Sequence, residues 1–138
     1  MGADGRAAMN VEYRTISRKD YEQVRAFFSA NGWAHRVADP ERFAKMLDNS
    51  DRTVVAWDVG QVVGFARALC DGVSNGLLSM VAVAEDWRGQ GIGREMVRRL
   101  MGNDLDITWT LRAGRGSEGF WRKMGFAVSE IAMVRARR

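Results

Sequence analysis

The amino-acid sequence predicts an α/β (α+β) domain in which helices flank a mixed, mostly antiparallel central sheet. In the first half, short runs of β-branched and aromatic residues follow one another across tight turns, which favours antiparallel pairing. In the second half, strand and helix patterns alternate, which favours parallel pairing through a helical crossover. The predicted order of elements is therefore β-α-α-β-β-β-α-β-α-β.

The chain is expected to begin with one strand and two helices. Residues 11–16 alternate between apolar and polar side chains, which predicts a strand. Ser17 is the candidate N-cap of a helix that should end near residues 31–32, because glycine is common just past a helix end. A second helix is expected over residues 41–47, with Asp39 as its N-cap.

The rest of the predicted sheet lies on both sides of a third helix. Further strands are expected at residues 52–57, 62–69, 77–83, 107–111 and 126–134, and further helices from Gly93 onward and over residues 117–124. Two short turns, Asp58–Gln61 and Asn75-Gly76, carry the residue types that reverse a chain. The last alternating run therefore predicts a final strand at the end of the chain.

Length and composition predict a single domain with no targeting segment. The 138 residues include 46% hydrophobic and 28% charged residues, which is ordinary for a globular protein. Residues 1–9 are small and polar, and we expect them to be disordered. No apolar run approaches the roughly 18 residues of a membrane span, and the first residues lack the apolar core of a signal peptide. A cytoplasmic protein without a membrane partner is expected.

Charge and metal-ligand counts exclude two further classes. The net charge is +4, but the basic residues are scattered, and no basic helix carries interleaved aromatic residues. We therefore expect no nucleic-acid partner; a small polyanion is sufficient to explain the charge. One cysteine and one histidine are too few for a structural zinc site built from these residues, and no metal is expected.

A glycine-rich segment joins a predicted strand to the third helix. Gly89, Gly91 and Gly93 have no Cβ, so the backbone can adopt positive φ there and lie close to a ligand. At the N-terminus of a helix, unpaired N–H groups and the macrodipole favour an anion, typically a phosphate. The segment therefore predicts a phosphate-binding loop, with Arg88 and Arg94 adding positive charge.

Two common phosphate-binding patterns do not fit this loop. A Walker loop requires GxxxxGK followed by Ser or Thr, and the sequence contains no such run. A dinucleotide-binding GxGxxG counted from Gly91 would need a third glycine where Met96 stands. The pattern that remains is Arg88-x-x-Gly91-x-Gly93, directly after a strand.

This pattern resembles the acyl-CoA pyrophosphate loop of the GCN5-related N-acetyltransferases, the GNAT family. Residues 119–126, Gly-Phe-Trp-Arg-Lys-Met-Gly-Phe, look like the family's late helix motif, usually Phe-Tyr-x-Lys-Leu-Gly-Phe. The resemblance covers roughly residues 11–134, since the order of elements agrees as well. It implies a single acyl-CoA N-acyltransferase domain over residues 10–138, with the sheet splayed at the central strand.

The resemblance also implies acetyl-CoA as co-substrate. Backbone groups at the end of the central strand would pair with the pantetheine arm, and the N–H groups that follow would hold the pyrophosphate. The implied CoA-binding residues are Val81, Ala82, Val83, Arg88, Gly89, Gln90, Gly91, Ile92, Gly93, Arg94, Ser117 and Phe120.

The catalytic groups are less clearly marked. Trp121 stands where the family often has a tyrosine thought to protonate the leaving thiolate, and an indole cannot serve as such a proton donor. Another group or water protonates the thiolate, or it leaves unprotonated. Glu85 is the candidate general base, although it also fits a solvated turn, and a water relay would serve as well. Trp33 and His35 are candidate acceptor-binding residues, although His35 also fits an ordinary surface histidine.

The resemblance implies an N-acetyltransferase that moves acetyl from acetyl-CoA to a primary amine, by direct attack in a ternary complex. The small size favours a small-molecule amine as the acceptor. A protein N-terminus or lysine is the alternative acceptor, and a non-catalytic acyl-CoA-binding module is the alternative function. Members of this family often dimerise through their late strands, so a homodimer is also an expectation.

Overall fold

The structure, a computed structural model, describes residues 10–138, and the predicted disorder of residues 1–9 lies outside this part. The strands are β1 (Glu12–Arg14), β2 (Arg52–Asp58), β3 (Gln61–Cys70), β4 (Asn75–Val83) and β5 (Thr108–Thr110). The α-helices are α1 (Tyr21–Phe28), α2 (Pro40–Asp48), α3 (Ile92–Met101) and α4 (Glu118–Lys123). Short helical turns are formed by Arg18–Asp20, Ser29–Trp33, Ala34–Arg36 and Glu85–Trp87.

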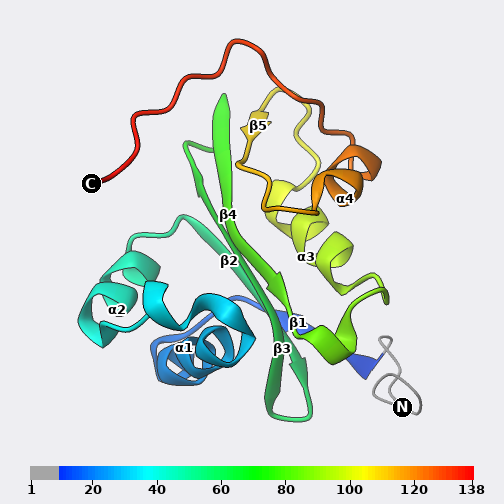
Figure 1. Cartoon of the computed structure of the whole chain (residues 1–138). Coiled ribbons are helices and arrows are strands. Elements are labelled where there is room, and N and C mark those ends of the chain that lie inside the picture. Colours follow the sequence, from blue (N-terminus) through cyan, green and yellow to red (C-terminus); the bar gives the residue numbers. More distant parts are fainter. Residues whose placement is uncertain (1–9) are drawn as a thin grey trace.

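The described strands form one five-stranded sheet in the order β1-β2-β3-β4-β5. The first four pair antiparallel with their neighbours, and β5 pairs parallel with β4. Figure 1 shows α1 and α2 on one face of the sheet and α3 and α4 on the other. The predicted fold class, a mixed and mostly antiparallel sheet flanked by helices, is therefore confirmed.

The predicted final strand is wrong. Residues 126–134 form no strand, and Figure 1 shows them as irregular chain that follows α4. Their apolar side chains are largely exposed, with Ile131 at 91% and Met133 at 95%. An alternating pattern makes a segment suitable for a strand, but a strand also needs a neighbour with a free edge of matching length. The edge strand β5 is only three residues long and offers little to pair with.

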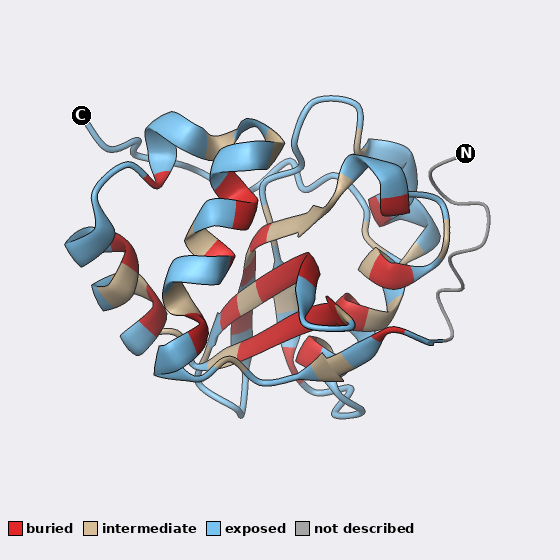
Figure 2. Cartoon of the chain, turned by 90° about the horizontal axis from the view of Figure 1, so that it is seen from below, coloured by how far each residue is buried: buried red, intermediate tan, exposed pale blue. Residues whose placement is uncertain are grey.

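The sheet buries a core on each face, as Figure 2 shows by the buried residues on its central strands. Along β2, Val54 and Ala56 belong to the cluster that includes α3, whereas Val55 and Trp57 belong to the cluster that includes α1 and α2. This is the period of two that a strand imposes on its side chains. Because both faces are covered, β2 and β3 read as nearly continuous apolar runs.

The central strand β4 opens away from β5. The two strands pair only over Asn75–Leu77, so the rest of β4 has no strand on that side. On its other side β4 follows β3, with a bulge between the Ser79 and Ala82 pairs. The bulge contains Met80, a buried residue with φ of 56°. A bulge bends and twists the strand that carries it, so it leads β4 away from β5.

The close pairing at the base of this opening depends on Gly76. A Cβ atom there would lie 2.3 Å from the nearest atom of the Trp109 ring. We predict that Gly76→Ala lowers the free energy of unfolding by about 1–3 kcal/mol, because the ring must move from its place. Urea unfolding checks this, with Gly119→Ala as control, since a Cβ at Gly119 meets nothing within 4 Å. An equal effect of the two changes would contradict the prediction.

The β3–β4 turn is organised by the carboxylate of Asp71. It accepts hydrogen bonds from the Ser74 hydroxyl at 2.6 Å and from the backbone N–H groups of Val73, Ser74 and Asn75. These bonds, that of the Ser74 hydroxyl first, hold the pKa of Asp71 far below its ordinary value. The charged form therefore stabilises the fold above pH about 4, and this contribution is lost as the pH falls through the lowered pKa.

We predict that Asp71→Asn flattens the pH dependence of stability in acid. The wild type should be the more stable protein at pH 7, and the difference should shrink as the pH falls from about 5 to 2. Urea unfolding at a series of pH values measures it. Asp58→Asn in the β2–β3 turn is the control, because no hydrogen bond to its carboxylate occurs in the described part of the chain. A constant difference between wild type and Asp71→Asn would refute the idea.

Candidate functional site

The glycine loop connects the free end of β4 to α3. The loop starts with a hydrogen bond from Ala84 N to Val63 O at 2.9 Å, and the following helical turn buries Trp87 at 3% exposure. Beyond this anchor, Gly89 and Gly91 adopt φ of 77° and 86°. Residues other than glycine rarely adopt this left-handed conformation, which explains the two glycines.

The N-terminus of α3 presents its N–H groups to open space. Gly91 is the N-cap, and the first hydrogen bond of the helix runs from Glu95 N to Gly91 O at 3.0 Å. The N–H groups of residues 92–94 precede this bond, and the glycine cap has no side chain to satisfy them. A Cβ atom at Gly89 or Gly91 would meet nothing within 4 Å. The loop thus has the geometry and the dipole of an anion site.

The charged and polar side chains of the loop suit the same ligand. The Arg88 Nε donates to Val83 O at 3.2 Å, which ties the side chain to the end of β4. Arg94 is exposed and makes no ion pair within residues 10–138. Glu95, the nearest acid on the helix, is paired with Arg98 and Arg99, and hydrogen bonding to Arg98 is the first cause that lowers its pKa.

Gln90 carries an unsatisfied polar atom in this loop. Its Nε2 is shielded from solvent and has no hydrogen-bond partner in the described chain. A buried donor of this kind is costly unless something accepts its hydrogen bond. Open glycines, helix N–H groups and an unpartnered amide are what a diphosphate would require, so the residues present fit CoA.

The structure brings three of the predicted CoA-binding elements together. A Cβ at Gly93 would lie 3.4 Å from the Phe120 ring and 3.6 Å from the Val83 side chain. The start of α3, the end of β4 and the start of α4 therefore meet at Gly93. Val81 and Val83 pack toward the α3 side of the sheet and Ala82 toward the other, and all three lie on the part of β4 without a β5 partner.

Ser117, just before the late motif, and Trp121 within it both make their contacts inside the protein. The Ser117 hydroxyl donates to Gly114 O at 2.6 Å and so points into its own turn. Trp121 is 8% exposed and packs edge-to-face on Phe120 and Phe126. The indole at the usual tyrosine position is therefore part of the core, and it holds Phe120 in place.

The acceptor candidates lie apart from the glycine loop, whereas the catalytic candidate Glu85 lies near its start. Trp33 packs edge-to-face on Phe28 at 5.2 Å and is half-buried, whereas His35 is exposed. Both belong to the segment between α1 and α2, which covers the face of the sheet opposite α3 (Figure 1). Glu85 is exposed in the turn after β4.

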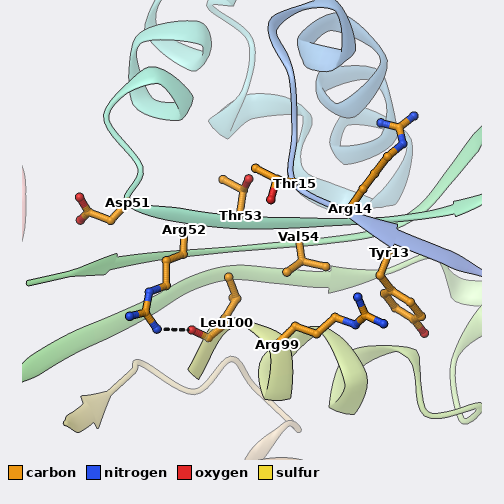
Figure 3. A pocket seen from close by; sticks show the side chains of 9 residues that line it. All are labelled: Tyr13, Arg14, Thr15, Asp51, Arg52, Thr53, Val54, Arg99 and Leu100. Carbon is orange, nitrogen blue, oxygen red and sulfur yellow. Dashed lines mark hydrogen bonds between the residues drawn. The ribbon is translucent and has the colours of Figure 1, made fainter. Parts of the chain in front are cut away.

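A separate hollow of about 380 Å³ lies at the other end of α3, between that helix and strands β1 and β2. Figure 3 shows its lining, including the hydrogen bond from Arg52 to Leu100 O at 2.7 Å. Arg14 pairs with Asp20, and Arg99 pairs with Glu95. The basic side chains of this hollow are thus already occupied. The hydrogen bond from Arg52 stabilises the end of α3. None of the predicted site residues lines this hollow.

Two residues near the open part of β4, Met80 and Arg67, are not among the residues that the sequence predicts for the site. Met80 gives no signal, since a methionine in an apolar run does not indicate a left-handed bulge. Arg67 does give a sequence signal, because it is the charged residue within the apolar run 62–69. It lies half-buried on the same face of the sheet as Phe65, on the side of α1 and α2.

Neither a metal cluster nor a membrane helix is present in the part of the chain that the structure describes. No group of three or more His, Cys, Asp and Glu side chains there could hold a metal ion. No described helix is long and apolar enough to cross a bilayer.

Comparisons with known proteins agree with this geometry. A family sequence model described as an acetyltransferase (GNAT) domain matches residues 49–128. "Serotonin N-acetyltransferase 2, chloroplastic" from Oryza sativa subsp. japonica is 30% identical over 131 residues, 87% of this chain and 62% of the rice protein. A GNAT-family acetyltransferase from Streptococcus pneumoniae superposes with a TM-score of 0.75 at 25% identity, covering 93% of this chain and 97% of that chain.

A predicted acetyltransferase from Clostridium acetobutylicum, solved with acetyl-CoA, has a TM-score of 0.71 at 17% identity, covering 91% of this chain and 96% of that one. At this identity the likeness shows the fold alone. The present chain spans about 62% of the length of the rice relative. The matched family pattern extends over more than half of the chain, from the end of α2 to beyond α4. The chain belongs to the GNAT acetyltransferase family.

Proposed function

We propose that this protein transfers the acetyl group of acetyl-CoA to a primary amine, most simply that of a small molecule, by direct attack in a ternary complex. The observation that carries the proposal is the open glycine loop at the N-terminus of α3, placed directly beside the unpaired end of β4. The first suits a pyrophosphate, and the second suits the amide-bearing arm that follows it in CoA.

The binding roles follow from this arrangement. The N–H groups of residues 89–94 hold the pyrophosphate, and Arg88 and Arg94 add charge beside it. The Gln90 amide gains an acceptor for its unpartnered Nε2. Residues 81–83 pair with the pantetheine arm through their backbone, and Phe120 closes the side of the loop at Gly93. Ser117 contacts CoA only if its hydroxyl leaves Gly114 O.

The chain contributes mainly by positioning the two substrates. An alkyl ammonium has a pKa near 10, so the amine must lose a proton before its nitrogen attacks the thioester carbonyl. Attack forms the C–N bond and breaks the C–S bond, and the thiolate leaves. With Trp121 in the core, the thiolate departs as the anion, which its pKa near 8.5 allows, and solvent returns its proton. Glu85 or a water relay takes the proton that the ammonium loses before attack, and the second proton, lost from the nitrogen as the amide forms, goes to solvent.

The acceptor enters from the face of α1 and α2, where Trp33 and His35 lie on the connecting segment. A small-molecule amine, a cytoplasmic location and a homodimer complete the proposal, and neither nucleic acid nor a membrane takes part. The rice relative is named as a serotonin N-acetyltransferase. That name favours a low-molecular-weight amine over a protein acceptor.

We predict that acetyl-CoA and CoA raise the melting temperature, whereas ATP does not. A ligand at one hundred times its Kd adds about 2.7 kcal/mol to the stability of the state that binds it. For a domain of this size the rise is several degrees. Differential scanning fluorimetry measures it, and no rise at saturating acetyl-CoA would refute the assignment of the glycine loop as a CoA site.

Release of free thiol in the presence of amine panels then separates the possible activities. Turnover with small amines supports the proposal. Turnover only with peptide N-termini or lysine would replace the acceptor class, and tight binding without any turnover would identify an acyl-CoA-binding module instead.

We predict that Arg94→Gln weakens CoA binding about three- to tenfold, because one exposed charge-assisted contact to phosphate is lost. Isothermal titration calorimetry gives the Kd at low and high salt, and the loss should be smaller at high salt. Arg42→Gln is the matched control, since it removes the same charge from an exposed position of α2. Equal effects of the two changes on the Kd would show that Arg94 does not contact the phosphates of CoA.

A further inference from the structure

The face of the sheet beside α2 carries an arginine whose charge is not balanced. Arg67 of β3 lies directly opposite Thr53 of β2 and Ser79 of β4, so its side chain leaves the sheet on the side of α1 and α2. It is half-buried, and its Nη1 donates a hydrogen bond to the Ser50 hydroxyl at 3.1 Å. No carboxylate forms an ion pair with it in residues 10–138.

The free edge of this guanidinium is suited to a planar anion. With Nη1 directed to Ser50, the Nε and Nη2 groups remain, and they lie on the same edge of the guanidinium. Nε is shielded from solvent and has no hydrogen-bond partner in the described chain. Two parallel N–H groups on one edge match the two oxygens of a carboxylate.

A second arginine increases the positive charge at this place. Burial lowers the pKa of Arg67, and the nearby charge of Arg36 lowers it further. Arg36 lies on the α1–α2 segment, stacked over the Trp33 ring at 4.9 Å, and it too has no ion-pair partner among the described residues. Two nearby cations repel each other when no acidic side chain lies between them. An anion that binds between them removes this repulsion, so the place favours anion binding.

The position of Arg67 relates it to the proposed chemistry. Its cross-strand neighbour Ser79 is the second residue of β4 beyond the last β5 pair, at Leu77, and thus lies where the sheet opens. Adjacent strands are about 4.8 Å apart. An anion at Arg67 therefore lies one strand away from the free edge of β4. The next pair on the same face, Leu69 and Leu77, is 38% and 37% exposed and offers apolar surface.

We propose that Arg67 and Arg36 form a subsite for the carboxylate of the acceptor, so that the acceptor is an amino acid with an apolar side chain rather than a simple amine. This inference rests on the proposed acetyl transfer. The carboxylate takes the Nε–Nη2 edge of Arg67, and the amine extends from it toward the opening beside β4. The side chain of the acceptor lies over Leu69 and Leu77.

The first test compares three acceptors that share one side chain: leucine, leucinamide and 3-methylbutylamine. We expect kcat/KM for leucine to exceed that for the other two at least tenfold. Base strength does not produce this preference over the amide, because the amine of leucinamide is the weaker base and is deprotonated more readily. Equal or better use of leucinamide would overturn the proposal.

Variants assign the preference to its residues. Arg67→Gln should lower kcat/KM for leucine at least tenfold and leave leucinamide nearly unchanged, and Arg67→Lys should retain part of the preference. Arg36→Gln should act in the same direction with a smaller effect, and Arg42→Gln should change neither substrate. Melting temperatures establish that the variants fold. A parallel loss for both substrates in folded Arg67→Gln would mean a structural role and would refute the subsite.

A binding experiment keeps this inference separate from the proposed activity. The Arg67 Nε–H resonance is assigned by its loss in Arg67→Lys, and CoA-saturated protein is titrated with leucine and then with leucinamide. A shift with leucine alone supports the subsite even if no amine in the series is acetylated, in which case the proposed transfer fails instead. No shift with millimolar leucine would overturn the subsite while leaving acetyl transfer to other amines intact.

Discussion

The architecture depends on one discontinuity in backbone hydrogen bonding. β4 is paired with β3 along most of its length but with β5 only at Asn75–Leu77. Backbone groups that lose a strand partner must find another, since unpaired polar groups are costly when buried. The bulge at Met80 and the shortness of β5 therefore leave an edge in the middle of the sheet that is ready to pair with an extended ligand. The glycine loop follows the unpaired end of β4, and Arg67 lies on the adjacent strand β3, opposite Ser79.

The two faces of the sheet divide the proposed tasks. On the side of α3, the left-handed glycines and Phe120 lie around the N-terminus of that helix. On the side of α1 and α2, the half-buried Trp33 and the pair Arg67 and Arg36 lie over the same strands. A reaction between a thioester and an amine needs two substrates that meet without competing for one surface. Entry from opposite faces at a gap in the sheet meets that need.

The packing explains why the late helix can lack a tyrosine without losing its place. Trp121 stacks edge-to-face between Phe120 and Phe126 and is buried against the α3 cluster. Aromatic contacts of this kind add to the burial of the rings themselves. The residue thus fixes α4 and holds Phe120 against Gly93, whereas proton transfer falls to solvent in the proposed reaction. Positioning is retained and the side-chain acid is not.

The sequence by itself determined what depends on local pattern. Periodicity located the helices and the five described strands, and it added one strand, at residues 126–134, that does not form. Arg88-x-x-Gly91-x-Gly93 marked the loop, because positive φ and close approach require glycine. Together with the motif at residues 119–126 and the order of elements, it indicated the family. Only the tertiary structure decided which segments pair. Residues 126–134 alternate as a strand does but find no edge, Met80 is left-handed without any local signal, and Arg67 matters because nothing nearby neutralises it. Whether a strand pairs, where a bulge forms and whether a charge is balanced depend on segments that are distant in the sequence but close in space. A local sequence pattern does not specify such contacts.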